Sequence, residues 1–186
     1  MIDPPAAGTV VFESVARPLL LVHAVVGFTA VGTSTHFAAY AVVAALRGSA
    51  AAQLRRFSAL APAALVAQAL LGFALYPTYR VRVRLADLDR SAPAVAQLFD
   101  FKEHLAALAL ALVAAAALAA RAGASAPAGA RTSAQGAFGA MSAPPGGKGS
   151  LRARAVAALA TSGAALVWAA AIIGLYVTAR HPVGGR

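Results

Sequence analysis

Four long apolar stretches dominate this sequence, at residues 18–46, 57–77, 104–120 and 155–179. A bilayer core about 30 Å thick is crossed by about 20 helical residues, because each residue rises about 1.5 Å. The third stretch reaches this length only if residues 99–102 form its interfacial first turn. Only helices or closed barrels satisfy their backbone in lipid. The sequence therefore predicts a single all-α membrane domain over 1–186, with four transmembrane helices in an antiparallel bundle.

The composition agrees with a surface that faces lipid. Hydrophobic residues make up 60% of the 186 residues and charged residues only 12%, against about 25% charged in a soluble domain. The net charge of +10 would suggest nucleic-acid binding in a soluble protein, but here the basic residues lie between apolar runs. They are better explained as headgroup contacts and topology signals. We therefore expect the lipid bilayer as partner and no nucleic acid.

The sequence also argues against cysteine chemistry and against a cleavable signal peptide. The chain has no Cys, so disulfides, thiolate metal sites and a cysteine nucleophile are absent. Asp3 and Glu13 precede the first apolar run, where a cleavable signal peptide has a basic region. We therefore expect the first apolar stretch to be a retained helix.

The loops differ in net charge, and this difference predicts on which side of the membrane each loop lies. The loops at 47–56 and 121–154 carry a net charge of +8, whereas the termini and the segment 78–103 carry +2, because all six acids lie there. The basic residues are equal in number, but the short loop 47–56 holds three arginines close to helix ends, where the positive-inside rule weighs most. We expect both basic loops to be cytoplasmic, in a bacterial inner membrane. The Ala-rich composition suggests a high-GC bacterium.

Three connections join the spans. The short link 47–56 predicts a helical hairpin. In the segment 78–103, the sequence RVRVRL alternates as in an interfacial strand, and AVAQLFDF is typical of a helical lead-in to the third span. Residues 122–150 are rich in Gly, Ala, Ser and Pro and are predicted to be a disordered loop.

Histidines are the candidate chemical groups. His23 lies six residues after Arg17, and His104 lies two after Lys102, so both fall near the same membrane face. Two imidazoles from different helices at one depth are what bis-His haem ligation requires. His23 and His104 are therefore candidate metal ligands, although His104 also suits a plain interfacial position.

His36 lies near the middle of the first span. It shares a helix face with Thr29, Gly32, Thr33 and Tyr40, and Gln68 and Ser162 are candidates to reach it from other helices. An ionisable residue at this depth is often functional. The alternative is a structural histidine that only hydrogen-bonds within the bundle.

The pattern HAVVGFTAVGTSTH on one long helix, with one further His on another, resembles small four-helix membrane b-type cytochromes and related haem-handling membrane proteins. The resemblance covers one helix and one residue of another. It implies a haem b held by His23 and His104, with Arg80 or Arg82 near the propionates. His36 would then contact a quinone or a neighbouring subunit.

The sequence YPTYR ends the second span. Tyr76, Tyr79 and Arg80 can form an aromatic belt with a snorkelling cation. Alternatively, with the charged residues of 100–103, they form an interfacial site for a quinone headgroup, a haem propionate or a lipid. Tyr79 and Arg80 are therefore cofactor-binding candidates beside the histidines.

No hydrolase elbow, phosphate loop or zinc-protease motif is present, and the span interiors hold no carboxylate, which argues against a transporter that relays protons through Asp or Glu. The sequence favours an electron-transfer or haem-binding membrane protein, or the membrane subunit of a respiratory-type complex. The alternative is a non-catalytic scaffold or assembly subunit. Neither interpretation decides whether the chain is an enzyme.

Overall fold

The structure, a computed structural model, describes residues 10–124 and 150–180, in which every regular element is a helix. Four helices are long and apolar enough to cross a membrane, which confirms the predicted all-α class and the four long apolar helices. In chain order the elements are η1 (Glu13–Val15), α1 (Ala16–Arg47), α2 (Ala51–Thr78), η2 (Tyr79–Leu88), α3 (Asp89–Ser91), α4 (Pro93–Ala124) and α6 (Leu151–Arg180).

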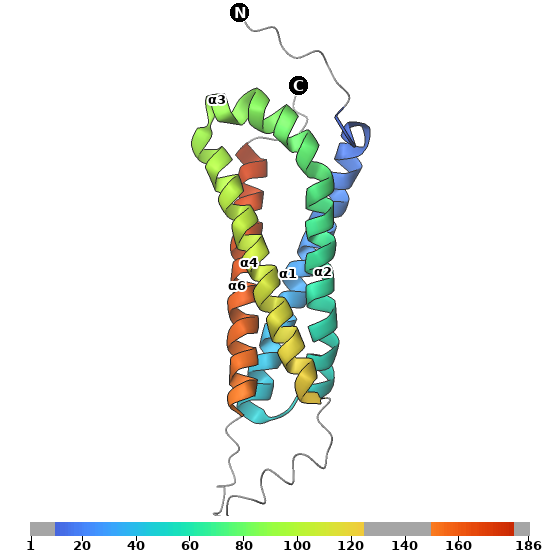
Figure 1. Cartoon of the computed structure of the whole chain (residues 1–186), viewed down its shortest axis with the longest axis vertical. Helices are drawn as coiled ribbons and strands as arrows, with labels where there is room; N and C mark the ends of the chain where they lie inside the picture. Colours follow the sequence, from blue (N-terminus) through green and yellow to red (C-terminus); the bar gives the residue numbers. More distant parts are fainter. Residues whose placement is uncertain (1–9, 125–149, 181–186) are drawn as a thin grey trace, which may run out of the picture.

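The long helices lie along the longest axis of the molecule (Figure 1). α1 packs against α2 and α6, and α4 packs against α6 and α2, so the four helices form a closed ring of neighbours. The link between α1 and α2, the end of α4 and the start of α6 lie at one end (Figure 1). The start of α1, the end of α6 and the arc of η2 and α3 lie at the other.

Small side chains form the core. Most fully buried residues are alanines, and Phe37 and Val113 are the largest fully buried side chains of this core. At Gly163, an added Cβ would lie 2.7 Å from Val113 Cγ2 and 3.3 Å from the Val113 amide nitrogen, so α4 and α6 cross in close contact. Large apolar side chains such as Leu21, Phe73 and Ile172 are exposed instead. The bundle therefore buries small residues and presents large ones outward, as membrane helices do.

The link between α1 and α2 is shorter than predicted. Gly48 ends α1 in the left-handed conformation, with φ 66°, and its amide donates to the Ala44 carbonyl. α2 already begins at Ala51, so only three residues connect the helices. Glycine adopts this conformation without a Cβ penalty.

The strand predicted for RVRVRL is wrong. Residues 79–88 form a π-helix that continues directly from α2. An isolated strand has no neighbouring strand to pair with its backbone groups, whereas a helix pairs them internally. The helix also sends Arg82 to Glu13 and Arg84 to Asp100, while a strand would point both arginines to one side.

The helical lead-in predicted for AVAQLFDF is confirmed, because α4 begins at Pro93 and runs through these residues into the third apolar stretch. Of the segment 122–150 predicted to be disordered, residues 122–124 belong to α4, and residues 125–149 lie outside the described residues.

Candidate functional site

A histidine and a glutamine meet between α1 and α2. The side-chain amide of Gln68 lies 2.8 Å from His23 Nε2. For the Gln68 amide to donate, His23 must be neutral and carry its proton on Nδ1. His23 Nδ1 and Gln68 Oε1 are both buried without a hydrogen-bond partner among the described residues. The pair therefore presents one unused donor and one unused acceptor inside the bundle.

Glycines make room for this pair. A Cβ at Gly27 would lie 3.2 Å from Gln68 Nε2, and a Cβ at Gly72 would lie 3.6 Å from His23 Cε1. Each glycine sits four residues along the helix from one member of the pair and faces the other member across the contact. The polar pair is thus fitted into the helix contact by residues that lack side chains.

A lysine from α4 completes the polar region. The Lys102 side chain is only 16% exposed, and its Nζ lies 2.8 Å from Glu103 Oε1 and 4.2 Å from the centroid of the Phe99 ring. A Cβ at Gly174 of α6 would lie 3.6 Å from Lys102 Cδ. Both Lys102 and Glu103 interact electrostatically with His23. We call His23, Gln68, Lys102 and Glu103 the inner polar cluster.

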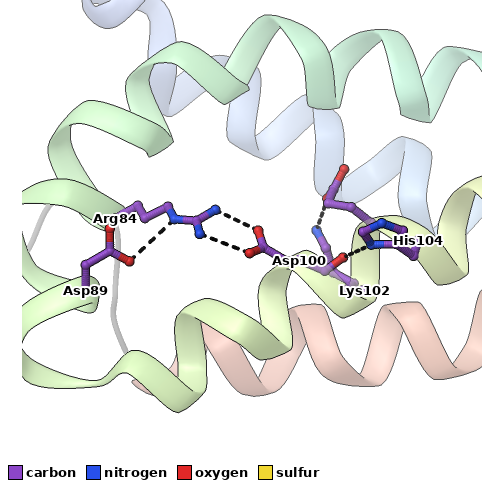
Figure 2. Close-up of polar contacts among 6 residues, drawn as sticks. Arg84, Asp89, Asp100, Lys102 and His104 are labelled. Atoms are coloured by element: carbon purple, nitrogen blue, oxygen red, sulfur yellow. Dashed lines mark hydrogen bonds and ion pairs between the residues drawn. The ribbon is translucent and has the colours of Figure 1, made fainter.

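An ion-pair network lies between this cluster and the end of the molecule. Arg84 makes two hydrogen bonds to Asp100, at 2.7 and 3.0 Å, and its Nε lies 3.4 Å from Asp89 Oδ1 (Figure 2). Such two-point contacts between guanidinium and carboxylate fix geometry as well as charge. The network therefore fastens η2 and α3 to the start of α4.

Tyr79 lies against the same region. Its ring stacks on Phe99 with centroids 3.9 Å apart, and its hydroxyl is buried without a partner among the described residues. The Phe99 ring thus contacts both the Tyr79 ring and the Lys102 ammonium group. Arg80, the neighbouring candidate, is exposed.

The N-terminal turn is attached to η2 by charge. Arg82 Nε lies 2.7 Å from Glu13 Oε1. The hydrogen bond from Arg82 lowers the pKa of the Glu13 carboxyl, which lies before the first apolar stretch. Arg82, a candidate for propionate binding, is therefore already paired with a carboxylate.

His104 is placed differently from His23. It is exposed, and its Nδ1 lies 2.8 Å from the Asp100 carbonyl one turn earlier on α4 (Figure 2). The described contacts of His23 across the bundle are with Gln68 and Gly72 of α2. Of the two neighbouring α4 residues, Lys102 is therefore the one that lies largely buried, and His104 is the one that is exposed.

His36 is also exposed, and its Nδ1 lies 2.7 Å from the Gly32 carbonyl of its own helix. Its ring stacks on Phe57 of α2, at 5.2 Å between centroids, and Tyr40 stacks on the same ring at 5.4 Å. The proposal that Gln68 reaches His36 is wrong, because the Gln68 amide is directed to His23, thirteen residues earlier on α1.

Sequence reasoning missed Lys102 as an interior group. Its position beside two acids and a histidine, Asp100, Glu103 and His104, suggested the membrane surface. The available signal was glycine placement, because Gly27, Gly72 and Gly174 face the three long polar side chains of the cluster.

No family model matches this chain, and no curated protein or solved structure shows significant similarity to it, so the inner polar cluster is interpreted from its own geometry.

Proposed function

We propose that the chain is a multi-pass protein of a bacterial inner membrane, whose four long helices cross the bilayer as an antiparallel bundle. The support is the length and apolarity of α1, α2, α4 and α6 together with their exposed large apolar side chains. The arginine-rich end, with the loops 47–56 and 121–154, lies in the cytoplasm under the positive-inside rule.

Within that membrane protein, the inner polar cluster binds a quinone headgroup, and the chain serves as the quinone-binding membrane subunit of an electron-transfer complex. The observation that carries this proposal is the unused pair of His23 Nδ1 and Gln68 Oε1. A quinone oxygen accepts a hydrogen bond from the imidazole N–H, and a hydroquinone hydroxyl donates one to the amide oxygen. Lys102 adds a cation beside them. Electrons come from a redox partner in the complex.

A bis-His haem between His23 and His104 is supported less by this arrangement. Two axial nitrogens must face one iron from opposite sides, whereas His104 is exposed and hydrogen-bonded to its own helix. Arg82, one of the two arginines implied for the propionates, is paired with Glu13. We therefore place quinone ahead of haem b as the cofactor.

A scaffold function is the second candidate, and one specific observation favours it. His36 and His104 each hydrogen-bond a carbonyl of their own helix, which satisfies one ring nitrogen without any ligand. If His23 behaves in the same way with Gln68, all three histidines within the spans only pack.

The test uses purified full-length protein and a short-chain benzoquinone. Wild-type protein binds the quinone, and His23→Leu weakens binding about tenfold, the effect of about 1.4 kcal/mol from a lost hydrogen bond. His36→Leu is the matched control, because it makes the same change on the same helix outside the cluster. Equal losses in both variants, or no binding by the wild type, would contradict the proposal.

The absorption spectrum of the same preparation separates the remaining alternatives. A Soret band in protein from haem-replete cells would favour haem b over quinone as the cofactor. Absence of both a Soret band and quinone binding would leave the scaffold function.

A further inference from the structure

The end of the bundle where α1 and α2 join carries one type of charge. Among the described residues, its charged side chains are all arginines, namely Arg47, Arg55, Arg56, Arg121, Arg152 and Arg154. The acids of the described residues lie in η1, η2, α3 and the first turns of α4, at the other end (Figure 1). Anionic headgroups are therefore attracted to the first end only.

A groove opens at this end between α1 and α6. It has a volume of about 350 Å³ and is lined by Val42, Ala45, Leu46, Arg154 and Ala157. Small-molecule pockets in proteins start at about this size. Ala45 and Ala157 are buried, whereas Leu46 is 72% exposed, so the groove has a floor of small residues and an open apolar edge.

The two arginines in the first turn of α6 have different roles. Arg152 donates from Nε to the Ala119 carbonyl of α4, at 3.0 Å, and so connects the two helices. The Arg154 side chain has no hydrogen bond or ion pair with the described residues, and it lines the groove. One guanidinium is thus structural, and its neighbour is available to a ligand.

We propose that this groove is a binding site for an anionic phospholipid. The lipid phosphate binds the Arg154 guanidinium, and an acyl chain lies along the apolar lining formed by Val42, Ala45, Leu46 and Ala157. Free phosphate would use the guanidinium but not the apolar lining. Phosphatidylcholine would offer both a phosphate and acyl chains, but it also carries a choline cation, which the surrounding arginines repel. The proposal depends on the membrane insertion proposed above and is independent of quinone binding.

The test is a lipid titration of delipidated full-length protein in detergent, followed by native mass spectrometry. The probes are phosphatidylglycerol and phosphatidylcholine with identical acyl chains, each measured with and without inorganic phosphate. We expect phosphatidylglycerol to bind more tightly than phosphatidylcholine and millimolar phosphate to leave the bound lipid in place. Equal binding of both lipids, or displacement by phosphate, would overturn the proposal.

Matched variants locate the site. Arg154→Gln should weaken phosphatidylglycerol binding about fivefold, the effect of one cation near a lipid surface. Arg56→Gln removes the same charge at the same end, on α2 and outside the groove lining, and should change binding by less than twofold. Equal losses would show general attraction to the arginine-rich end and overturn the site.

A third variant tests the apolar part. Leu46→Ser alters an exposed wall of the groove without touching charge, and it should weaken both lipids, with circular dichroism confirming that the helices are retained. Unchanged lipid binding by this variant would contradict the placement of the acyl chain. Quinone binding should be unaffected by any of these changes, which keeps the two proposals separately testable.

Discussion

The two halves of the bundle are built differently. In the half that includes the arginine-rich end, α1 buries Ala30, Ser34, Phe37, Ala38, Ala41 and Ala45. In the other half, α1 buries nothing from residue 16 to residue 29, and α6 buries only Val177 beyond Val167. The inner polar cluster lies in this second half. We call the first the packed half and the second the open half.

The difference assigns separate tasks to the two halves. Close alanine contacts gain van der Waals energy between helices in lipid, where the hydrophobic effect is absent. Polar side chains such as Gln68 and Lys102 hold the open half through hydrogen bonds and charge instead. One half thus packs through small apolar side chains, while the other contains buried polar atoms, His23 Nδ1 and Gln68 Oε1, that have no hydrogen-bond partner among the described residues.

Topology gives the largest expected effect, because labelling is all or none. The chain has no cysteine, so Ala50→Cys and Ala92→Cys introduce single thiols at the packed and open ends. In inside-out vesicles, a membrane-impermeant maleimide should label Ala50→Cys and leave Ala92→Cys unlabelled. Labelling of both from one side would contradict the four-span arrangement.

The packed half should not tolerate one additional methyl group at the crossing of α4 and α6. In Gly163→Ala the new Cβ meets the Val113 backbone as well as its side chain, and overpacking of this kind costs about 1–3 kcal/mol. Gly32→Ala is the matched control, since nothing lies within 4 Å of a Cβ there. Thermal unfolding in detergent should show a lower midpoint for Gly163→Ala and an unchanged or higher midpoint for Gly32→Ala.

Mutations of the polar pair in the open half, His23 and Gln68, should have non-additive effects on the free energy of unfolding. Gln68→Leu leaves His23 Nε2 buried without its partner and should lower the free energy of unfolding by about 1 kcal/mol. The double variant His23→Leu with Gln68→Leu should recover most of this loss, because no polar group remains unpaired. Additive losses in a double-mutant cycle would mean that the contact contributes no coupling.

The ion pair at the open end should have the smallest effect. Arg84 and Asp100 are partly exposed, at 27% and 42% of their side chains, and exposed pairs contribute about 0.2–1 kcal/mol. Arg84→Gln with Asp100→Asn, measured as a cycle at low and high salt, should give a coupling in this range that shrinks with salt. A coupling that is insensitive to salt would indicate a buried pair.

Sequence reasoning predicted the helices well because apolar length is a local property. Each of the four stretches lies inside one long helix. It failed at RVRVRL, where the alternation of charge is real but the backbone follows the helix that precedes it and the carboxylates that receive the arginines.

The candidate site was harder to predict because it depends on rotation about the helix axes. His23 was singled out by depth along α1, but depth alone could not tell whether its partner was His104 or Gln68. Residue spacing places Gln68 on a helix without giving the direction that the helix presents to α1. Only the glycines opposite the polar side chains carried that information.

We expect the close crossing of α4 and α6 at Gly163 and Val113 to limit how the open half can move. Lys102 lies eleven residues from Val113, and Gly174 lies eleven residues from Gly163, so each is about 16 Å from the crossing. A relative rotation of about 10° about that point would separate Lys102 from Gly174 by about 3 Å, with little change at the crossing itself. Distances between two pairs of spin labels, one pair at the crossing and one at the depth of Lys102 and Gly174, would measure this rotation. Equal distance changes in both pairs would exclude it. We therefore expect the tight contact at Gly163 to act as the pivot of such a rotation, with arms of equal length on the two helices.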